Sequence, residues 1–191
     1  MQARQFIQLF VIIFLLSGCA YRLGTSTRTI PGGAKKIAIP VFTNKTAEPG
    51  IEMAFTNALL QEFYRSKVAN VVGKAQAETL LTGTIKSLEY LPGAKKTSGD
   101  SSVPFLSEGA VLATEYRILL KVELRVIENA TGRVLWSGDF DGERTYIAPQ
   151  VTLAGVNSVN PLYNLSARRQ NIEVVALDLM AEAHDRITEN F

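Results

Sequence analysis

The chain has little of the chemistry that enzymes and metal sites commonly use. Its 191 residues include one cysteine and one histidine, which excludes a disulfide scaffold and a cysteine-based metal centre. Lys and Arg number 20 against 18 Asp and Glu, so the basic excess typical of a DNA-binding protein is absent. With 47% hydrophobic residues the composition is globular. We therefore expect no nucleic-acid partner, no metal and no cofactor.

Residues 1–18 have the pattern of a lipoprotein signal peptide. Arg4 precedes an apolar run at 9–16, which is too short to span a bilayer because spanning takes about 20 residues. The run leads into Leu16-Ser17-Gly18-Cys19, which resembles the bacterial lipobox. We predict that Cys19 becomes the acylated N-terminus. Two or more acyl chains attach a protein stably to a membrane, whereas one chain is marginal.

The predicted mature chain contains one domain. Residues 19–35, the lipidated N-terminus, are rich in Gly, Ser, Thr and Pro and are predicted to form a linker. Residues 36–191 are enough for one domain with a sizeable core. Ala20 stands where a signal for inner-membrane retention typically has Asp, which favours a domain held at the outer membrane and facing the periplasm.

Hydrophobic periodicity predicts an α+β fold. Alternating or β-branched segments predict strands at 36–42, 80–90, 116–127 and 133–144. Apolar residues at helical spacing predict helices from 51 to about 66 and from about 166 almost to the C-terminus. A right-handed crossover makes the first two strands parallel, and a meander follows. The order β-α-β-β-β-α therefore predicts a two-layer sandwich, a four-stranded mixed sheet with both helices on one face.

This topology brings three long connections, at about 43–49, 91–115 and 145–165, to one end of the sheet, and the linker enters at the other. The segment 145–165 contains no charged residue, which is unusual for a solvated loop. Either it packs on the domain's own core, or another protein or acyl chains bury it. The candidate partner-contact residues are Tyr146, Ile147, Leu153, Val156 and Leu162.

Basic side chains recur at every fourth position of the strand at 116–127, on the face opposite its apolar residues. Such a row can bind phosphates or carboxylates. The alternative is an ordinary solvated face on which Glu123 neutralises its neighbours. The candidate ligand-binding residues are Lys86, Arg117, Lys121 and Arg125.

No catalytic motif is present in the sequence. His184 lies beside Asp185 near the end of a predicted helix, and a Ser-His-Asp hydrolase has no motif support here. The acidic run at 139–143 does not match a calcium-binding loop and is typical of an edge strand protected from aggregation. We therefore expect a protein that is not an enzyme and has no catalytic residue.

Several stretches resemble the lipopolysaccharide-assembly lipoprotein family, LptE. They are the lipobox with Ala20-Tyr21-Arg22-Leu23, the segment 39–52, Thr56-Asn57-Ala58-Leu59, Leu81-Thr82-Gly83-Thr84-Ile85, Tyr116-Arg117 and 131–136. The resemblance implies a β-α-β-β-β-α sandwich without enzymatic activity. It also implies a plug and assembly partner for the outer-membrane β-barrel LptD that binds lipopolysaccharide during transport. The assignment of lipopolysaccharide contacts to the four basic residues above comes from the strand pattern alone.

Two other functions fit parts of the sequence. The pattern Val41-Phe42-x-Asn44-x-Thr46 also resembles periplasmic lipoproteins that activate peptidoglycan synthases or form subunits of secretion pores. A hydrolase that uses His184 is the enzymatic alternative.

Overall fold

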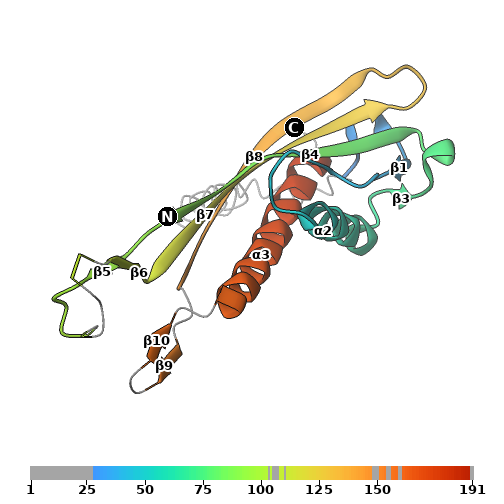
Figure 1. The fold of residues 1–191 in the computed structure, drawn as a ribbon. Coiled ribbons are helices and arrows are strands. Elements are labelled where there is room, and N and C mark those ends of the chain that lie inside the picture. Colours follow the sequence, from blue (N-terminus) through green and yellow to red (C-terminus); the bar gives the residue numbers. More distant parts are fainter. Residues whose placement is uncertain are drawn as a thin grey trace, which may run out of the picture.

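The computed structural model describes residues 28–102, 104, 108–109, 111–147, 151–153, 156–158 and 161–189, and only the backbone at 151–153, 156–158 and 161–163. Within these residues two helices pack on one face of a mixed sheet (Figure 1). The prediction of an α+β two-layer sandwich is confirmed.

The main sheet of the described residues has six strands rather than the predicted four. Its order is β3 (Asn70–Val71), β1 (Lys36–Ala38), β4 (Thr79–Pro92), β7 (Glu115–Glu128) and β8 (Val134–Ile147), with β2 (Thr43–Asn44) also paired to β4. β1 and β2 run parallel to β4, and β4, β7 and β8 form the predicted antiparallel meander. The extra strands are two residues long, so the sequence pattern gave no separate signal for them.

The predicted first strand, 36–42, is interrupted. Because Pro40 has no N–H to donate to a ladder, β1 ends at Ala38 and pairing with β4 resumes at Thr43. Between the two, the backbone N–H of Phe42 donates to Thr56 Oγ1 at 3.0 Å instead of to a strand. This hydrogen bond ties the interruption to the first helix and leaves the Phe42 ring buried over the sheet.

Both helices bury one apolar stripe against the sheet. In α2 (Ile51–Ser66), residues four apart are buried, and the helix begins and ends where the sequence predicts. α3 (Pro161–Thr188) begins five residues before the predicted start at 166. No helix of the described residues is long and apolar enough to cross a membrane. The shared core includes Phe55, Leu59, Phe63, Ile172, Val175, Leu179 and Met180.

The first predicted long connection, 43–49, lies beside the middle of β4, because Thr43 pairs with Thr84 and Asn44 with Ile85, and its Glu48 reaches along the sheet to Tyr90. The other two, 91–115 and 145–165, leave the sheet at one end, which we call the loop end (Figure 1). They are shorter than predicted because β4, β7 and β8 extend by one to three residues into them. They also contain two small hairpins, β5 (Lys95–Thr97) with β6 (Val111–Ala113), and β9 (Val151–Leu153) with β10 (Val156–Ser158).

Residues 28–35, which the sequence assigned to a linker, lie on the domain. Ile30 is 1% exposed, and a short 3-10 turn, η1 (Pro31–Gly33), follows it. The N–H of Thr29 donates to Thr188 O at 3.2 Å, and Arg28 forms an ion pair with Asp185 at 2.7 Å. The chain therefore enters beside the C-terminal end of α3, opposite the loop end as expected, and the packed domain begins by residue 28. Residues 19–27 lie outside the described residues.

Candidate functional site

The four predicted basic residues lie on the sheet face away from the helices, which we call the open face. Strand β7 alternates as predicted, with Ile118, Leu120, Val122, Leu124 and Val126 buried beneath the helices. Arg117, Lys121 and Arg125 point the other way and are exposed. Lys86 joins them from the irregular step in β4 between Ile85 and Ser87. The structure thus brings all four candidates to one surface.

Each of these cations is paired with a carboxylate. Lys86 contacts Asp139 at 2.7 Å and Glu123 at 3.4 Å. The further pairs are Arg125 with Glu123 at 2.6 Å, Lys121 with Asp141 at 3.7 Å and Arg117 with Glu143 at 3.0 Å. The acidic run of β8 therefore lies beside the basic row of β7. The open face is a set of ion pairs, most of them between strands and one within β7, rather than a bare cationic strip.

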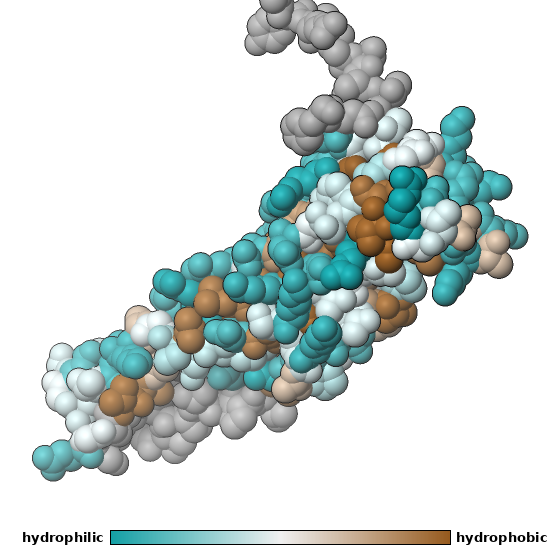
Figure 2. All heavy atoms as spheres, turned by 90° about the horizontal axis from the view of Figure 1, so that it is seen from above, coloured by the Kyte–Doolittle hydropathy of each residue, from teal (hydrophilic) through white to brown (hydrophobic). Residues whose placement is uncertain are grey.

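These ion pairs are exposed and exchangeable. The hydrogen bond to Asp139 raises the pKa of Lys86, and the hydrogen bond from Arg125 lowers the pKa of Glu123, so both groups stay charged at neutral pH. Surface pairs of this kind contribute little to the free energy of folding, because water and salt screen them. Figure 2 shows one side of the molecule, where hydrophilic side chains dominate and hydrophobic residues form small separate patches.

A second site lies at the loop end on the helix side of the sheet. A pocket of about 410 Å³, which we call the loop-end pocket, is lined by three tyrosines from the strands and three residues from the start of α3: Tyr90, Tyr116, Tyr146, Asn164, Leu165 and Arg168. The rings of Tyr116 and Tyr146 stack, with centroids 5.8 Å apart and an interplanar angle of 24°. The Tyr146 hydroxyl donates to Asn164 Oδ1 at 3.4 Å, which joins β8 to α3.

Arg168 brings a positive charge to the loop-end pocket, and Glu48, which does not line this pocket, neutralises it. The Arg168 guanidinium lies over the Tyr90 ring, 4.8 Å from its centroid, and its Nη2 is 3.0 Å from Glu48 Oε2. The Tyr90 hydroxyl also donates to Glu48, at 3.3 Å. Burial raises the pKa of Tyr90 and of Tyr146 further above neutral pH, and both hydroxyl protons are used in the hydrogen bonds to Glu48 and Asn164.

A hydrogen-bonded turn before α2 holds Glu48 in place. Asn44 Oδ1 accepts from the N–H and the hydroxyl of Thr46, at 2.9 and 2.8 Å, which is an Asx turn. Asn44 Nδ2 donates to Glu48 O at 2.7 Å and to Glu52 Oε2 at 2.9 Å. Glu52 in turn accepts from the N–H of Gly50 at 3.1 Å. The Asn44 to Glu52 stretch therefore has a positioning role at the loop end.

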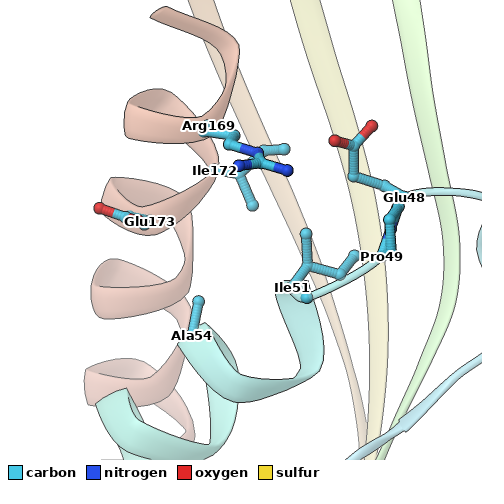
Figure 3. A pocket seen from close by; sticks show the side chains of 8 residues that line it. Glu48, Pro49, Ile51, Ala54, Arg169, Ile172 and Glu173 are labelled. Atoms are coloured by element: carbon cyan, nitrogen blue, oxygen red, sulfur yellow. The ribbon is translucent and has the colours of Figure 1, made fainter. Parts of the chain in front are cut away.

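A smaller pocket, of about 200 Å³, lies between the N-terminal end of α2 and α3. Figure 3 shows Arg169 reaching from α3 toward Ile51 and Glu48, while Glu173 points away from them. Glu48 thus lines this pocket and also contacts residues of the loop-end pocket.

The predicted partner-contact residues have different environments. Tyr146 is 8% exposed and belongs to the domain core, which is the self-packing alternative that the sequence left open. The neighbouring Ile147 is 78% exposed and points to the opposite face of β8. The side chains of Leu153, Val156 and Leu162 lie outside the described residues.

Sequence reasoning missed most of the loop-end pocket. In the sequence, Glu48 and Tyr116 stood out only as members of two stretches that resemble the LptE family, 39–52 and Tyr116-Arg117. Tyr90 and Arg168 were not singled out. Glu48 and Arg168 are 120 positions apart, and no periodic pattern reports a contact over that distance.

The single histidine joins the C-terminal ends of the two helices. His184 is fully buried, with Nε2 2.8 Å from Ser66 Oγ and Nδ1 3.4 Å from Asp185 Oδ1. Its ring meets Phe63 edge to face at 4.9 Å. Asp185 also pairs with Arg28. Ser66, His184 and Asp185 are connected in the order of a Ser-His-Asp hydrolase triad. Here, however, the imidazole is buried and links α2 to α3. The described residues contain no group of three or more His, Cys, Asp or Glu able to hold a metal.

The burial of His184 predicts a pH-dependent stability. Burial lowers the pKa of His184 below 6.5, while the neighbouring Asp185 opposes the shift. As pH falls through 6.5, the unfolded chain takes up a proton that the folded chain does not, so the free energy of unfolding falls toward the folded-state pKa. His184→Gln should flatten this decline between pH 7 and 5, measured by urea unfolding. Because no other histidine is present, an equal decline in both proteins would contradict the assignment.

Comparisons with known proteins agree with this architecture. The sequence model of the family described as "LptE: Lipopolysaccharide-assembly" matches residues 34–190. No curated protein matches the sequence significantly.

Solved structures of similar shape share little sequence. The PelC dodecamer subunit of Paraburkholderia phytofirmans is 16% identical, with 81% of this chain and 89% of that chain covered and a TM-score of 0.48. A minor lipoprotein from Acinetobacter baumannii is 14% identical, with coverages of 81% and 92% and a TM-score of 0.45. A Helicobacter pylori protein described as a homologue of neuraminyllactose-binding hemagglutinin is 10% identical, with coverages of 88% and 92% and a TM-score of 0.50. That last likeness concerns the fold alone.

Proposed function

The chain belongs to the LptE lipopolysaccharide-assembly family, and on that premise we propose that it binds lipopolysaccharide and acts as the plug and assembly partner of an LptD-type outer-membrane β-barrel. The observation that carries the proposal is the extent of the family match, which spans residues 34–190 and so nearly all of the described domain. The family assembles lipopolysaccharide and is not enzymatic, which agrees with a protein whose sequence has no catalytic motif.

The anchor belongs to the same proposal. Cys19 would carry the acyl chains and hold the domain at the periplasmic side of the outer membrane. The described chain enters at the end of the domain opposite the loop end, through Arg28 and Ile30. The loop end is the part of the sheet farthest from residue 28, where the described chain begins, and there it can reach into a partner.

We assign the phosphorylated part of lipopolysaccharide to the open face. Arg117, Lys121, Arg125 and Lys86 are exposed there, at 40–66% of their side chains. The β8 carboxylates of Asp139, Asp141 and Glu143 have 55–75% of their side chains exposed, so phosphate oxygens can exchange with them. The exchange moves each cation from a carboxylate to a phosphate without leaving a buried charge unpaired.

Two double variants test the open face in opposite directions. Asp141→Asn with Glu143→Gln removes two carboxylates and should tighten lipopolysaccharide binding several-fold. Arg117→Gln with Lys121→Gln removes two cations and should weaken it by about tenfold at low salt, with both effects shrinking as salt rises. Binding is measured with labelled lipopolysaccharide and the purified protein in detergent.

The two variants control for each other, because both remove the same two ion pairs. If the missing ion pairs only destabilised the fold, both variants would lose affinity for lipopolysaccharide alike. If the open face binds the ligand, one variant gains affinity and the other loses it. Equal affinity of both variants and the parent at low salt would exclude the open face as the binding site.

A further inference from the structure

The loop-end pocket has the features of a small-molecule site and has no assigned ligand. Its volume of about 410 Å³ falls in the range of about 300–1,000 Å³ that ligand pockets occupy. It combines an aromatic wall, formed by the stacked Tyr116 and Tyr146, with the polar groups of Asn164 and Arg168. An apolar wall with a few convergent polar groups is the usual composition of such sites.

The charges around the pocket define the class of ligand. Among the described residues, Arg168 is the only ionised one that lines the pocket, and Glu48 compensates that charge at 3.0 Å. A carboxylate or phosphate would have to displace Glu48, which is held by the Asn44 turn and is mostly buried with a side-chain exposure of 11%. The pocket is therefore suited to an uncharged ligand.

The polar groups favour a ligand with hydroxyls. The Tyr90 and Tyr146 hydroxyls already donate to Glu48 and Asn164, so each can accept a hydrogen bond from a ligand hydroxyl through its oxygen. The amide of Asn164 supplies a donor and an acceptor. Among the described residues, Arg168 Nε is one of two buried side-chain polar atoms with no hydrogen-bond partner, so the hydrogen bonding of this side chain is incomplete. A planar aromatic wall with donors and acceptors at its rim matches a molecule that has one apolar face and several hydroxyls.

We propose that the loop-end pocket binds the ring of an uncharged sugar, with one face of the ring against Tyr116 and its hydroxyls directed to Asn164, Arg168 and the tyrosine hydroxyls. The site is distinct from the open face, since the lining tyrosines point to the helix side of the sheet. It goes beyond the proposed function, which assigns the phosphates of lipopolysaccharide and not its sugars. The sugar ring could come from lipopolysaccharide or from a free saccharide, and the experiment separates the two.

The test measures binding of three probes to the purified protein: lipopolysaccharide with its core sugars, lipid A without them, and the core oligosaccharide released from lipopolysaccharide. The proposal predicts that the parent binds the released oligosaccharide and that Tyr116→Leu weakens this binding about tenfold, which is the loss of one well-packed aromatic contact. Tyr116→Leu should leave lipid A binding unchanged. Tyr64→Leu is the matched control, because Tyr64 lies on α2, is 62% exposed and lines no part of the pocket.

The outcomes separate this proposal from the proposed function. If the parent binds the oligosaccharide and lipopolysaccharide, and Tyr116→Leu weakens both, the pocket takes a sugar of lipopolysaccharide. If it binds the oligosaccharide but neither lipopolysaccharide nor lipid A, the pocket takes a free saccharide and the proposed function fails. The sugar site is overturned if the parent does not bind the oligosaccharide, or if Tyr116→Leu and Tyr64→Leu bind it equally while the thermal midpoints stay unchanged.

Discussion

Replacing Gly83 with alanine is expected to lower the free energy of unfolding by about 3 kcal/mol. Gly83 lies in β4 directly under the Phe42 ring, and an alanine Cβ there would be 2.3 Å from Phe42 Cε2 and 2.4 Å from Cδ2. Atoms cannot approach so closely, so either the ring or the strand must move. Phe42 is 3% exposed and its N–H is held by Thr56, which leaves the ring little room.

The same substitution should also disturb the loop end. Phe42 immediately precedes β2 and the Asn44 turn that positions Glu48. A displaced ring moves that turn, and the contact of Glu48 with Arg168 weakens with it. We therefore expect Gly83→Ala to reduce binding at the loop-end pocket as well as stability.

Gly73→Ala provides the control for Gly83→Ala. A Cβ at Gly73 meets no atom within 4 Å, and its φ of −65° suits any residue, so the change should be within about 0.5 kcal/mol of neutral. A second variant, Phe42→Leu in the Gly83→Ala background, should restore part of the lost stability by removing ring atoms from the clash. Equal unfolding midpoints for Gly83→Ala and Gly73→Ala in urea would contradict the packing described.

The sequence predicted the fold because its elements are long and periodic. Strand β7 alternates apolar and charged residues without a break, and α2 buries residues four apart, so both follow directly from the pattern. The sequence predicted one strand over 36–42 and did not show its interruption at Pro40. The path of residues 39–42 between β1 and β2 depends on Phe42 and Thr56 meeting across the core, and a local pattern contains no information about that contact.

The candidate site was predicted unevenly for the same reason. The outward direction of Arg117, Lys121 and Arg125 follows from strand periodicity, and the structure agrees with it. The β8 partners of Arg117 and Lys121 depend on the register between two strands, which the sequence does not specify, whereas Glu123, the partner of Arg125, lies on the same strand. The loop-end pocket depends on contacts among three distant segments, and its chemistry became evident only when the structure placed Glu48 beside Arg168.

The central claim is that this protein works with an LptD-type β-barrel, and capture of that barrel from outer membranes tests it most directly. The protein is tagged and isolated in detergent, together with a Cys19→Ser form that has no acyl anchor, so that recovery by shared membrane alone is excluded. We expect both forms to retain the β-barrel in comparable amounts, because the domain and not the anchor makes the contact. Recovery of a peptidoglycan synthase in its place, or of no β-barrel by either form, would contradict the account.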